Sequence, residues 1–175
     1  NENGSGDTTT SIEYIAPPSF KPNIILILGD DVGYEIPTCN GGQSYYTPNI
    51  DMMAQNGMRF TQCHSSPLCS PSRFMLLTGK YNFRNYNQWG VMSQSQKTIA
   101  NMLKDAGYAT YIAGKWQLDG GDKSIHTFGF DDYCVLNPYE TDPDHPNWRR
   151  YKDPDIFVNG NYLSRNLTKG KYSED

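Results

Sequence analysis

The chain has 175 residues, of which 37% are hydrophobic, 13% aromatic and 19% charged, and this composition excludes a disordered segment or a coiled coil. The formal net charge of −4 gives no electrostatic reason to expect a nucleic acid or an anionic membrane as a partner. The longest strongly apolar run, residues 24–28, is too short to span a bilayer, and four cysteines without Cys-x-x-Cys spacing predict neither a zinc ribbon nor a disulfide scaffold.

The first part of the chain changes character at residue 21. Residues 1–20 are polar and rich in Gly, Ser and Thr, which predicts a flexible leader. Residues 23–28 form a continuous apolar run that is closed by Gly29 and is typical of a strand covered on both faces in a parallel α/β sheet. We therefore expect a leader over residues 1–20 and a folded part over residues 21–175.

Local signals predict three helices and further strands. A Thr or Ser precedes, and a Gly follows, each of three apolar stretches with helical spacing, residues 48–56, 71–78 and 99–106. Residues 108–113 predict a second strand that is halted by a glycine, and residues 58–61 predict another short one.

The periodic pattern ends after residue 118. Residues 137–155 are dense in Pro, Asp and Asn, which predicts a long surface excursion. Two confident strands and three helices are few for a closed α/β domain, so we expect the chain to be the N-terminal part of a larger one.

The first candidate for chemistry is the carboxylate pair Asp30 and Asp31, directly after the first predicted strand. Adjacent carboxylates repel each other unless a cation lies between them, and their oxygens favour a hard ion such as calcium or magnesium. The carboxyl end of the strands is also where ligands bind in an open α/β sheet. A polar turn is the alternative explanation of the pair.

The second candidate is the segment Cys-Ser-Pro-Ser-Arg, residues 69–73. Cys69 lies just before a predicted helix start, where backbone N–H groups and the helix dipole favour an anion. Arg73 lies one turn into that helix and can point back towards the cysteine. The two predict an anion pocket with a nucleophile at its edge, with a buried cysteine beside a capped helix as the alternative. The short Cys-to-Arg spacing disfavours a cysteine-dependent phosphatase loop.

The third candidate is Lys115, at the end of the second predicted strand. If the two strands are parallel, Lys115 projects from the same edge of the sheet as Asp30, with a solvated loop lysine as the alternative. Three such placements at one edge make a site hypothesis, whereas each alone does not. The sequence contains no nucleotide phosphate loop, and its three scattered His residues predict no catalytic base.

These residues match a known family. The strings P-N-I-I-L-I-L-G-D-D, T-P-N-I-D-x-x-A-x-x-G-x-R-F, C-S-P-S-R, L-L-T-G-K, A-G-Y-A-T-Y-I-A-G-K-W and G-F-D-D-Y occur in the family's order between Pro22 and Tyr133. The chain therefore resembles the N-terminal part of a type I sulfatase of the alkaline phosphatase superfamily. The resemblance implies an α/β fold with a mixed, mainly parallel central sheet flanked by helices, of which this chain holds the first portion.

The resemblance also implies a role for each candidate residue. Cys69 would be oxidised to formylglycine, whose hydrate attacks sulfur, and Arg73 would hold and activate this hydrate. Asp30 and Asp31, with the modified Cys69, would be ligands of a calcium ion, with magnesium as the alternative. Lys115 would be catalytic by binding the sulfate group, and its charge would stabilise the transferring group.

One position departs from the family pattern. The family usually has a sulfate-contacting His two positions after the Lys, and this chain has Gln117 there. An amide can donate a hydrogen bond to the sulfate, but it cannot act as a general acid for the leaving oxygen. We therefore expect either another proton donor, for which His126 is a candidate, or a leaving group that needs little help.

The resulting hypothesis is a sulfuric ester hydrolase that cleaves an aryl or carbohydrate sulfate monoester after maturation by a formylglycine-generating or sulfatase-maturating enzyme. The rivals are a phosphomonoester or phosphonate-ester hydrolase of the same superfamily and a non-catalytic binding homologue. The family's remaining metal and sulfate ligands come later in its chain, so we expect residues 1–175 alone to be inactive. The polar leader favours an exported protein, whether periplasmic, tethered to the cell surface or secreted.

Overall fold

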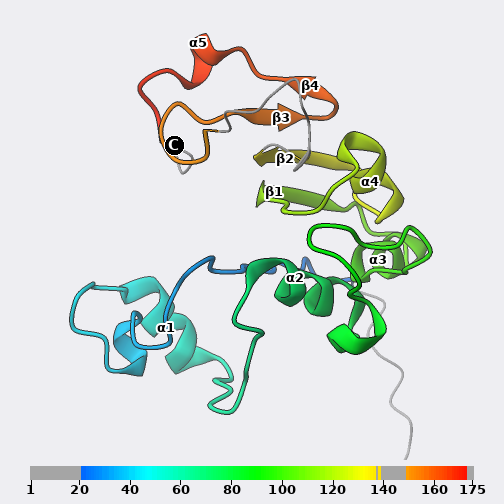
Figure 1. Cartoon of the computed structure of the whole chain (residues 1–175). Coiled ribbons are helices and arrows are strands. Elements are labelled where there is room, and N and C mark those ends of the chain that lie inside the picture. The colour runs from blue at the N-terminus through cyan, green and yellow to red at the C-terminus, as the bar shows by residue number, and fades with distance from the viewer. Residues whose placement is uncertain (1–20, 137, 139–148, 173–175) are drawn as a thin grey trace, which may run out of the picture. The chain divides into compact units, whose positions relative to one another are not determined.

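The computed structural model describes residues 21–136, 138 and 149–172 (Figure 1). Contacts between backbones divide the chain after Asp30, and residues 31–175 form the larger of two compact units. The predicted leader and most of the predicted surface excursion lie outside the described residues. Within the described part of the chain, every helix is too short or too polar to cross a bilayer.

The helices and strands of the described residues, taken in chain order, are η1 (Thr38–Asn40), α1 (Pro48–Asn56), α2 (Cys69–Thr78), η2 (Asn82–Arg84), α3 (Ile99–Asp105), β1 (Tyr111–Lys115), α4 (Gly121–Thr127), β2 (Asp132–Leu136), β3 (Ile156–Val158), β4 (Asn161–Tyr162) and α5 (Arg165–Thr168).

The three helices predicted from capping residues are confirmed as α1, α2 and α3. The cap of α3 is the fullest, because the Thr98 hydroxyl accepts a hydrogen bond from the Asn101 backbone N–H at 3.2 Å while the Asn101 side chain accepts from the Thr98 N–H. The start of α2 differs from the prediction. This helix begins at Cys69 with Leu68 as its N-cap, so the cysteine lies in the first turn and not before it.

Two predicted strands are wrong. Residues 24–28 adopt no strand, and their side chains are between 42% and 84% exposed. Residues 58–61 also form no strand, and Met58 and Phe60 are exposed. An apolar run indicates that the side chains of a segment favour burial. A strand, however, forms only where a neighbouring strand supplies hydrogen-bond partners for its backbone. Within the described residues neither segment has such a partner.

The sheet has the strand order β1-β2-β3-β4. Strand β1 pairs with β2 in parallel, and the connection between them carries α4, whereas the β2–β3 and β3–β4 pairings are antiparallel. The mixed α/β class expected from the sequence is confirmed, and one of the three described pairings is parallel. Sequence patterns missed α4, α5 and strands β2 to β4. Helix α4 has one clearly apolar residue, Ile125, and so shows no apolar stripe, while β3, β4 and α5 have only three, two and four residues.

Strand β1 starts three residues later than predicted, at Tyr111. Its ladder begins where β2 begins, since Tyr111 pairs with Asp132. The residue before it, Thr110, is engaged differently, because its backbone N–H donates to the Asp131 carboxylate at 3.0 Å. The start of the strand is therefore set by its partner and not by its own apolar pattern.

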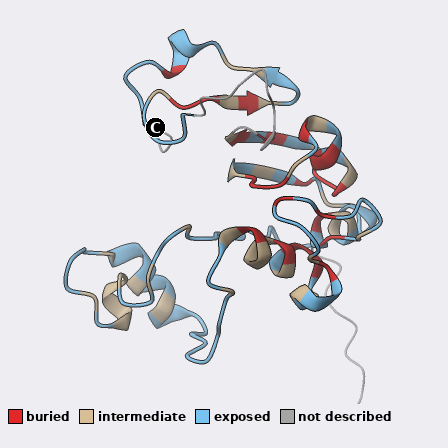
Figure 2. Ribbon diagram, in the orientation of Figure 1, coloured by how far each residue is buried: buried red, intermediate tan, exposed pale blue. Residues whose placement is uncertain are grey.

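The core is aromatic and lies among α2, α4 and the first three strands (Figure 2). Trp116 is 1% exposed, and its ring contacts Phe128 and Phe130 at centroid distances of 6.2 and 5.9 Å. Phe74 of α2 is fully buried and meets Tyr86 edge-on at 5.3 Å. Helix α1, in contrast, has no buried residue. Phe74 and Trp116 thus anchor the segments next to them in the core of the described residues.

Helix α3 is fixed to the loop after α4 by close backbone contact. The Thr98 hydroxyl donates to the Phe128 carbonyl oxygen at 2.5 Å, and the Asn101 amide donates to the Thr127 carbonyl oxygen at 3.0 Å. Gly129 follows with a φ of 96°, and a Cβ atom there would lie 2.4 Å from the Asn101 backbone nitrogen. Only glycine satisfies both this conformation and this approach.

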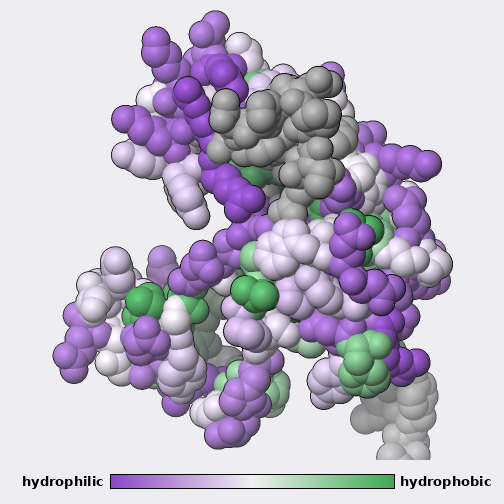
Figure 3. Space-filling view, viewed as in Figure 1, coloured by the Kyte–Doolittle hydropathy of each residue, from purple (hydrophilic) through white to green (hydrophobic). Residues whose placement is uncertain are grey.

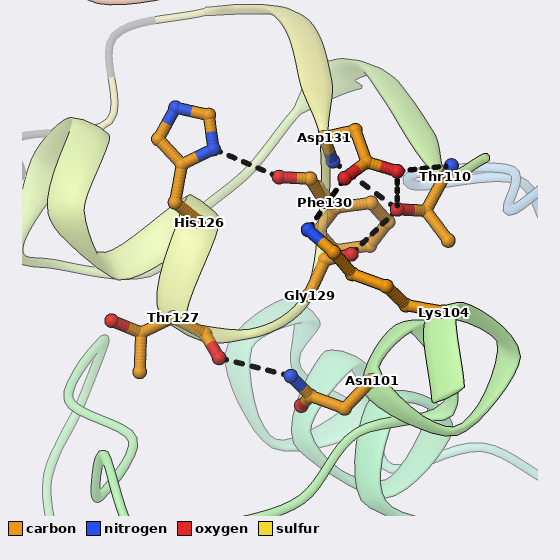
Figure 4. A network of polar contacts seen from close by, with 8 residues as sticks. All are labelled: Asn101, Lys104, Thr110, His126, Thr127, Gly129, Phe130 and Asp131. Atoms are coloured by element: carbon orange, nitrogen blue, oxygen red, sulfur yellow. Dashed lines mark hydrogen bonds and ion pairs between the residues drawn. The ribbon is translucent and has the colours of Figure 1, made fainter. Parts of the chain in front are cut away.

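A polar network continues this contact at the start of β2 (Figure 4). The Lys104 ammonium lies 2.5 Å from one Asp131 carboxylate oxygen, and the Thr110 backbone N–H donates to the other at 3.0 Å. The hydrogen bond from Lys104 and the one from the Thr110 backbone lower the pKa of Asp131 from 3.8 to about 2. The carboxylate therefore favours the folded state whenever it is charged.

We expect the Asp131→Asn variant to unfold at a lower urea concentration than the wild type at pH 7, with the difference shrinking as the pH falls from about 4 towards 2. The sign follows from the pKa, which is lower in the fold than in the unfolded chain. Stabilisation is then complete above the unfolded value and is lost as the pH falls through the folded one. Urea midpoints measured across this range check the expectation.

The matched control is Asp105→Asn, because Asp105 pairs with Lys97 at 2.6 Å while both side chains are 64% exposed, and such surface pairs contribute little. An Asp131→Asn deficit that stays constant down to pH 2 would contradict the role assigned to this carboxylate.

Candidate active site

The predicted nucleophile lies at the start of a ten-residue helix. Cys69 is the first residue of α2 and is half-buried. The N-cap residue, Leu68, provides no side-chain hydrogen bond to the first turn, so the backbone N–H groups there lack the usual side-chain acceptor. With the helix dipole they make this end favourable for an anion. All four cysteines are free thiols.

Arg73 joins this helix to the end of β1. Its guanidinium Nη1 donates to the Lys115 backbone carbonyl at 2.5 Å, across 42 residues of sequence. Arg73 lies four positions after Cys69, which places both on one face of α2. This hydrogen bond thus connects the nucleophile helix to the strand end that carries Lys115. The predicted placement of Lys115 beside Asp30 required a parallel strand over residues 23–28, which these residues do not form, so that placement stays a prediction.

The backbone at the end of β1 is unusual. Gly114 has a φ of 91°, and three residues later Gln117 has a φ of 57° while its side chain is only 6% exposed. A left-handed conformation costs free energy in a residue such as Gln, and such strain gathers at functional sites. Asp31 has a φ of 56°, which Asp tolerates better. Two of the predicted site residues therefore hold conformations that the surrounding structure must impose.

A buried serine links the same two segments a second time. The Ser70 hydroxyl, fully buried in α2, accepts a hydrogen bond from the Gly90 backbone N–H at 3.0 Å. The Gly90 carbonyl oxygen then accepts from the Asp119 backbone N–H at 2.6 Å. The backbone of one residue, Gly90, thus connects the first turn of α2 to the loop that follows Gln117.

The loop before Cys69 is held by side chains of α2 and η2. The Ser72 hydroxyl donates to the Ser66 carbonyl oxygen at 2.9 Å. The Asn82 amide oxygen accepts from the Ser66 hydroxyl at 3.0 Å, and its amide nitrogen donates to the Pro71 carbonyl oxygen at 2.9 Å. The segment that leads into Cys69 is therefore held by one side chain of α2 and one of η2.

The predicted metal ligands come from both compact units of the chain. Asp30 ends the first of the two compact units, whereas Asp31 and Cys69 belong to the second. Within residues 21–136, 138 and 149–172, no group of three or more His, Cys, Asp or Glu side chains is arranged to hold a metal ion. Two adjacent carboxylates suit a hard cation, but calcium takes six to eight oxygen ligands. The donor set fits calcium as one part of a site.

His126 has partners of its own in α4. Its Nδ1 lies 2.9 Å from the Phe130 carbonyl oxygen, and its Nε2 lies 3.3 Å from an oxygen of the Asp122 carboxylate. Its ring also lies beside that of Tyr133, with centroids 5.7 Å apart. These contacts assign His126 to the packing of α4 against β2, so it is a poor replacement for a histidine at Gln117.

A cavity of about 350 Å³ lies elsewhere, between η1 and α1. It contains none of the predicted site residues, and its lining includes Asp51, which accepts a hydrogen bond from the Cys39 backbone N–H at 2.7 Å. The Arg59 guanidinium donates to the Cys39 carbonyl oxygen. The cavity therefore belongs to the packing of this segment and is separate from the candidate active site.

Sequence reasoning missed the contribution of Ser70 and Gly90. The Ser-Pro dipeptide indicated a helix cap, whereas the Ser70 hydroxyl is directed to Gly90, twenty residues later. No local sequence pattern predicts a hydrogen bond between residues twenty positions apart. A serine buried beside a functional motif is visible only once the fold is known.

Comparison with known proteins finds one matching family and several similar sequences. A family model described as Sulfatase matches residues 22–173. Human arylsulfatase D is 38% identical over 153 residues, which cover 73% of this chain and 26% of the relative. Human arylsulfatase G is 37% identical over 166 residues, which cover 88% of this chain and 31% of the relative. The N-acetylgalactosamine-6-O-sulfatase of Bacteroides thetaiotaomicron is 43% identical over 113 residues, which cover 60% and 22%.

Solved structures share the fold. A structure described under the metabolism of multiple glycosaminoglycans by Bacteroides thetaiotaomicron superposes with a TM-score of 0.67 at 33% identity, covering 83% of this chain and 33% of that chain. Ps i-CgsB superposes with a TM-score of 0.73 at 26% identity, covering 87% and 38%. The chain spans about a quarter to a third of the length of the human relatives it matches.

We expect Ser70→Ala to lower the free energy of unfolding by about 1–3 kcal/mol, because the buried Gly90 N–H loses its acceptor. Ser70→Thr keeps the hydroxyl and should recover part of this loss. Ser95→Ala is the control, since Ser95 is exposed and its hydroxyl contacts only Ser93 at 2.8 Å. Urea unfolding of the three variants checks the link, and an equal loss for Ser70→Ala and Ser95→Ala would disprove it.

Proposed function

The chain belongs to the sulfatase family, and from this we propose that the protein hydrolyses a sulfate monoester through a hydrated formylglycine made from Cys69. The observation that carries the proposal is the hydrogen bond from Arg73 to the Lys115 carbonyl. It joins the helix that starts with the nucleophile to the strand that ends with the sulfate-binding lysine. This contact supports a site in which an arginine and a lysine, both suited to an anion, act with a nucleophile at a helix N-terminus.

The chemistry assigns one task to each side chain. As a formylglycine hydrate, Cys69 carries two hydroxyls: one accepts the sulfuryl group, and loss of the proton from the other expels sulfate and restores the aldehyde. Arg73, one turn into the helix, orients this hydrate and offers positive charge. Lys115 binds the sulfate oxygens, where negative charge gathers in the transition state. An unmodified thiol has no second hydroxyl with which to release a sulfur-linked ester.

Asp30 and Asp31 would hold the metal, for which calcium is the first choice and magnesium the alternative. A bound divalent cation would acidify the attacking hydroxyl and draw charge from the sulfate. The two carboxylates need further oxygen ligands, and the matched relatives are several times longer than the aligned segment. The proposal therefore concerns the protein that carries the whole family domain.

The leaving group is constrained by Gln117. This buried amide can donate a hydrogen bond to the sulfate but cannot protonate the departing oxygen, and His126 is engaged in α4. Relatives of this chain are named arylsulfatase, steryl-sulfatase and N-acetylglucosamine-6-O-sulfatase. An aryl or carbohydrate sulfate monoester is the substrate class, and a maturating enzyme that oxidises Cys69 is a required partner. Export of the protein stays a prediction from the leader.

We expect the full-length protein, produced with a formylglycine-generating enzyme, to release sulfate from 4-nitrophenyl sulfate. The peptide that contains Cys69 should be about 18 Da lighter than the thiol form. Cys69→Ala and Cys69→Ser should both abolish sulfate release, whereas Cys63→Ala, at an exposed cysteine, should retain it. Mass spectrometry and sulfate assays provide the measurements.

The matched phosphate ester, 4-nitrophenyl phosphate, separates the rivals. A larger kcat/KM on phosphate that still depends on Cys69 would favour the phosphoester hydrolase. A persistent thiol together with no turnover in protein from its native host would favour the binding homologue.

A second expectation concerns Gln117→His in the mature enzyme. Histidine tolerates a left-handed φ better than most residues, and a protonated imidazole can supply the missing acid. We expect kcat on an alkyl sulfate to rise by up to about 100-fold and to fall again above the histidine pKa, because general acids contribute such factors. Hydrolysis of 4-nitrophenyl sulfate should change little. Gln117→Asn is the control, and equal pH profiles for the two variants would show that position 117 does not reach the leaving oxygen.

A further inference from the structure

The register of the sheet places a second group of residues at the edge that carries Lys115. Lys115 pairs with Leu136, and Leu136 pairs with Ile156, the first residue of β3. The Leu163 N–H, just after β4, donates to the Ile156 carbonyl oxygen at 2.9 Å. Neighbouring strands lie about 4.8 Å apart, so Ile156 lies roughly 10 Å from Lys115 across two ladder steps. The segments before β3 and after β4 therefore flank this same edge.

These two segments are bound to each other. The Asp153 backbone N–H donates to the Lys171 carbonyl oxygen at 2.9 Å, and the Gly170 N–H donates to the Asp153 carboxylate at 2.6 Å. Lys152 and Tyr172 form an isolated antiparallel bridge. Residues 149–155 and 164–172 thus form one surface at the sheet edge.

This surface concentrates positive charge. Six basic side chains occur within residues 149–172, against two acidic ones, and all six are exposed. We call these residues the basic edge: Arg149, Arg150, Lys152, Arg165, Lys169 and Lys171. Strongly hydrophilic side chains gather over this end of the chain around α5 (Figure 3). In residues 21–136 and 138, nine basic and nine acidic side chains balance.

The two acidic residues within this surface are already occupied. Asp155 is 2% exposed and lies 3.2 Å from the Arg165 guanidinium. Burial raises the pKa of the Asp155 carboxyl, but the Tyr162 hydroxyl and the hydrogen bonds from the Arg149 backbone and the Arg165 guanidinium outweigh this, and its pKa lies below the usual value. Asp153 lies 3.5 Å from the Arg149 guanidinium. Both carboxylates therefore bind residues of this surface to one another.

The flanking sequence carries further carboxylates outside the described residues. These are Glu140, Asp142, Asp144, Glu174 and Asp175.

We propose that the basic edge binds a second anionic group of the substrate, so that the substrate is a sulfated polysaccharide and its scissile ester lies at Lys115. This inference rests on the proposed sulfatase function. A single aryl or steroid sulfate has one anion and leaves the basic edge unoccupied when its ester lies at Lys115, whereas a polyanionic chain can occupy both. Arginine suits sulfate because its planar fork donates two parallel hydrogen bonds. Exposed Tyr151 and Tyr172 add flat apolar faces to the same surface.

The test compares two double variants of the full-length protein that remove the same charge. Lys169→Gln with Lys171→Gln changes the basic edge, and Lys97→Gln with Lys123→Gln changes exposed lysines elsewhere. The probes are a heparin-derived hexasaccharide, its desulfated form, a 15-residue oligothymidylate and 4-nitrophenyl sulfate. None of the four lysines has a role in the proposed catalytic site.

We expect the basic-edge variant to bind the sulfated hexasaccharide roughly tenfold more weakly than the wild type, with a shallower dependence of log Kd on log salt. The control variant should match the wild type, the desulfated hexasaccharide should bind neither protein, and kcat/KM on 4-nitrophenyl sulfate should be unchanged. Equal hexasaccharide affinities for both variants would overturn the proposal, as would an oligothymidylate that binds as tightly as the hexasaccharide. Absence of turnover on every sulfate ester would instead refute the proposed function and leave the binding result interpretable.

Discussion

The hydrogen bond from Arg73 to the Lys115 carbonyl is the contact on which the candidate site depends. Each of its ends is set by a buried aromatic neighbour, since Phe74 is fully buried and Trp116 is 1% exposed. The aromatic side chains fix the two backbones in the core, so the charged side chains next to them extend in defined directions. The close packing of these aromatic side chains in the core therefore holds Arg73 and Lys115 in defined positions.

The sheet gathers functional groups by register more than by sequence proximity. A parallel pairing sets the end of β1 beside the end of β2, and the antiparallel hairpin then returns the chain to the same edge. The ends of β1 and β2 and the start of β3 are therefore brought to one edge by their pairing, although they lie far apart in the sequence. A single edge can therefore carry both the proposed site of sulfur chemistry and the proposed surface for the rest of a charged substrate.

Sequence alone predicted the parts of the molecule that have local causes. The three helices were readable because their caps and their apolar spacing lie within one segment. The placement of Lys115 beside Asp30 was argued from two parallel strands, and residues 24–28 form no strand. The ends of elements were less accessible, because the start of β1 depends on its pairing with β2. The link from Ser70 to Gly90 could not be foreseen, since its two partners share no pattern. The ligand role of Asp30 and Asp31 stays a prediction.

The tight approach of Gly129 to α3 limits how this region can vary among related sequences. A Cβ atom there would meet the backbone of Ala100 and Asn101 and not a flexible side chain, so no rotamer change can make room. Any replacement would have to push α3 away from the loop that leads into β2 and would loosen the Asp131 network along with it. We therefore expect related sequences to keep glycine at position 129 and to vary at the exposed residues around it.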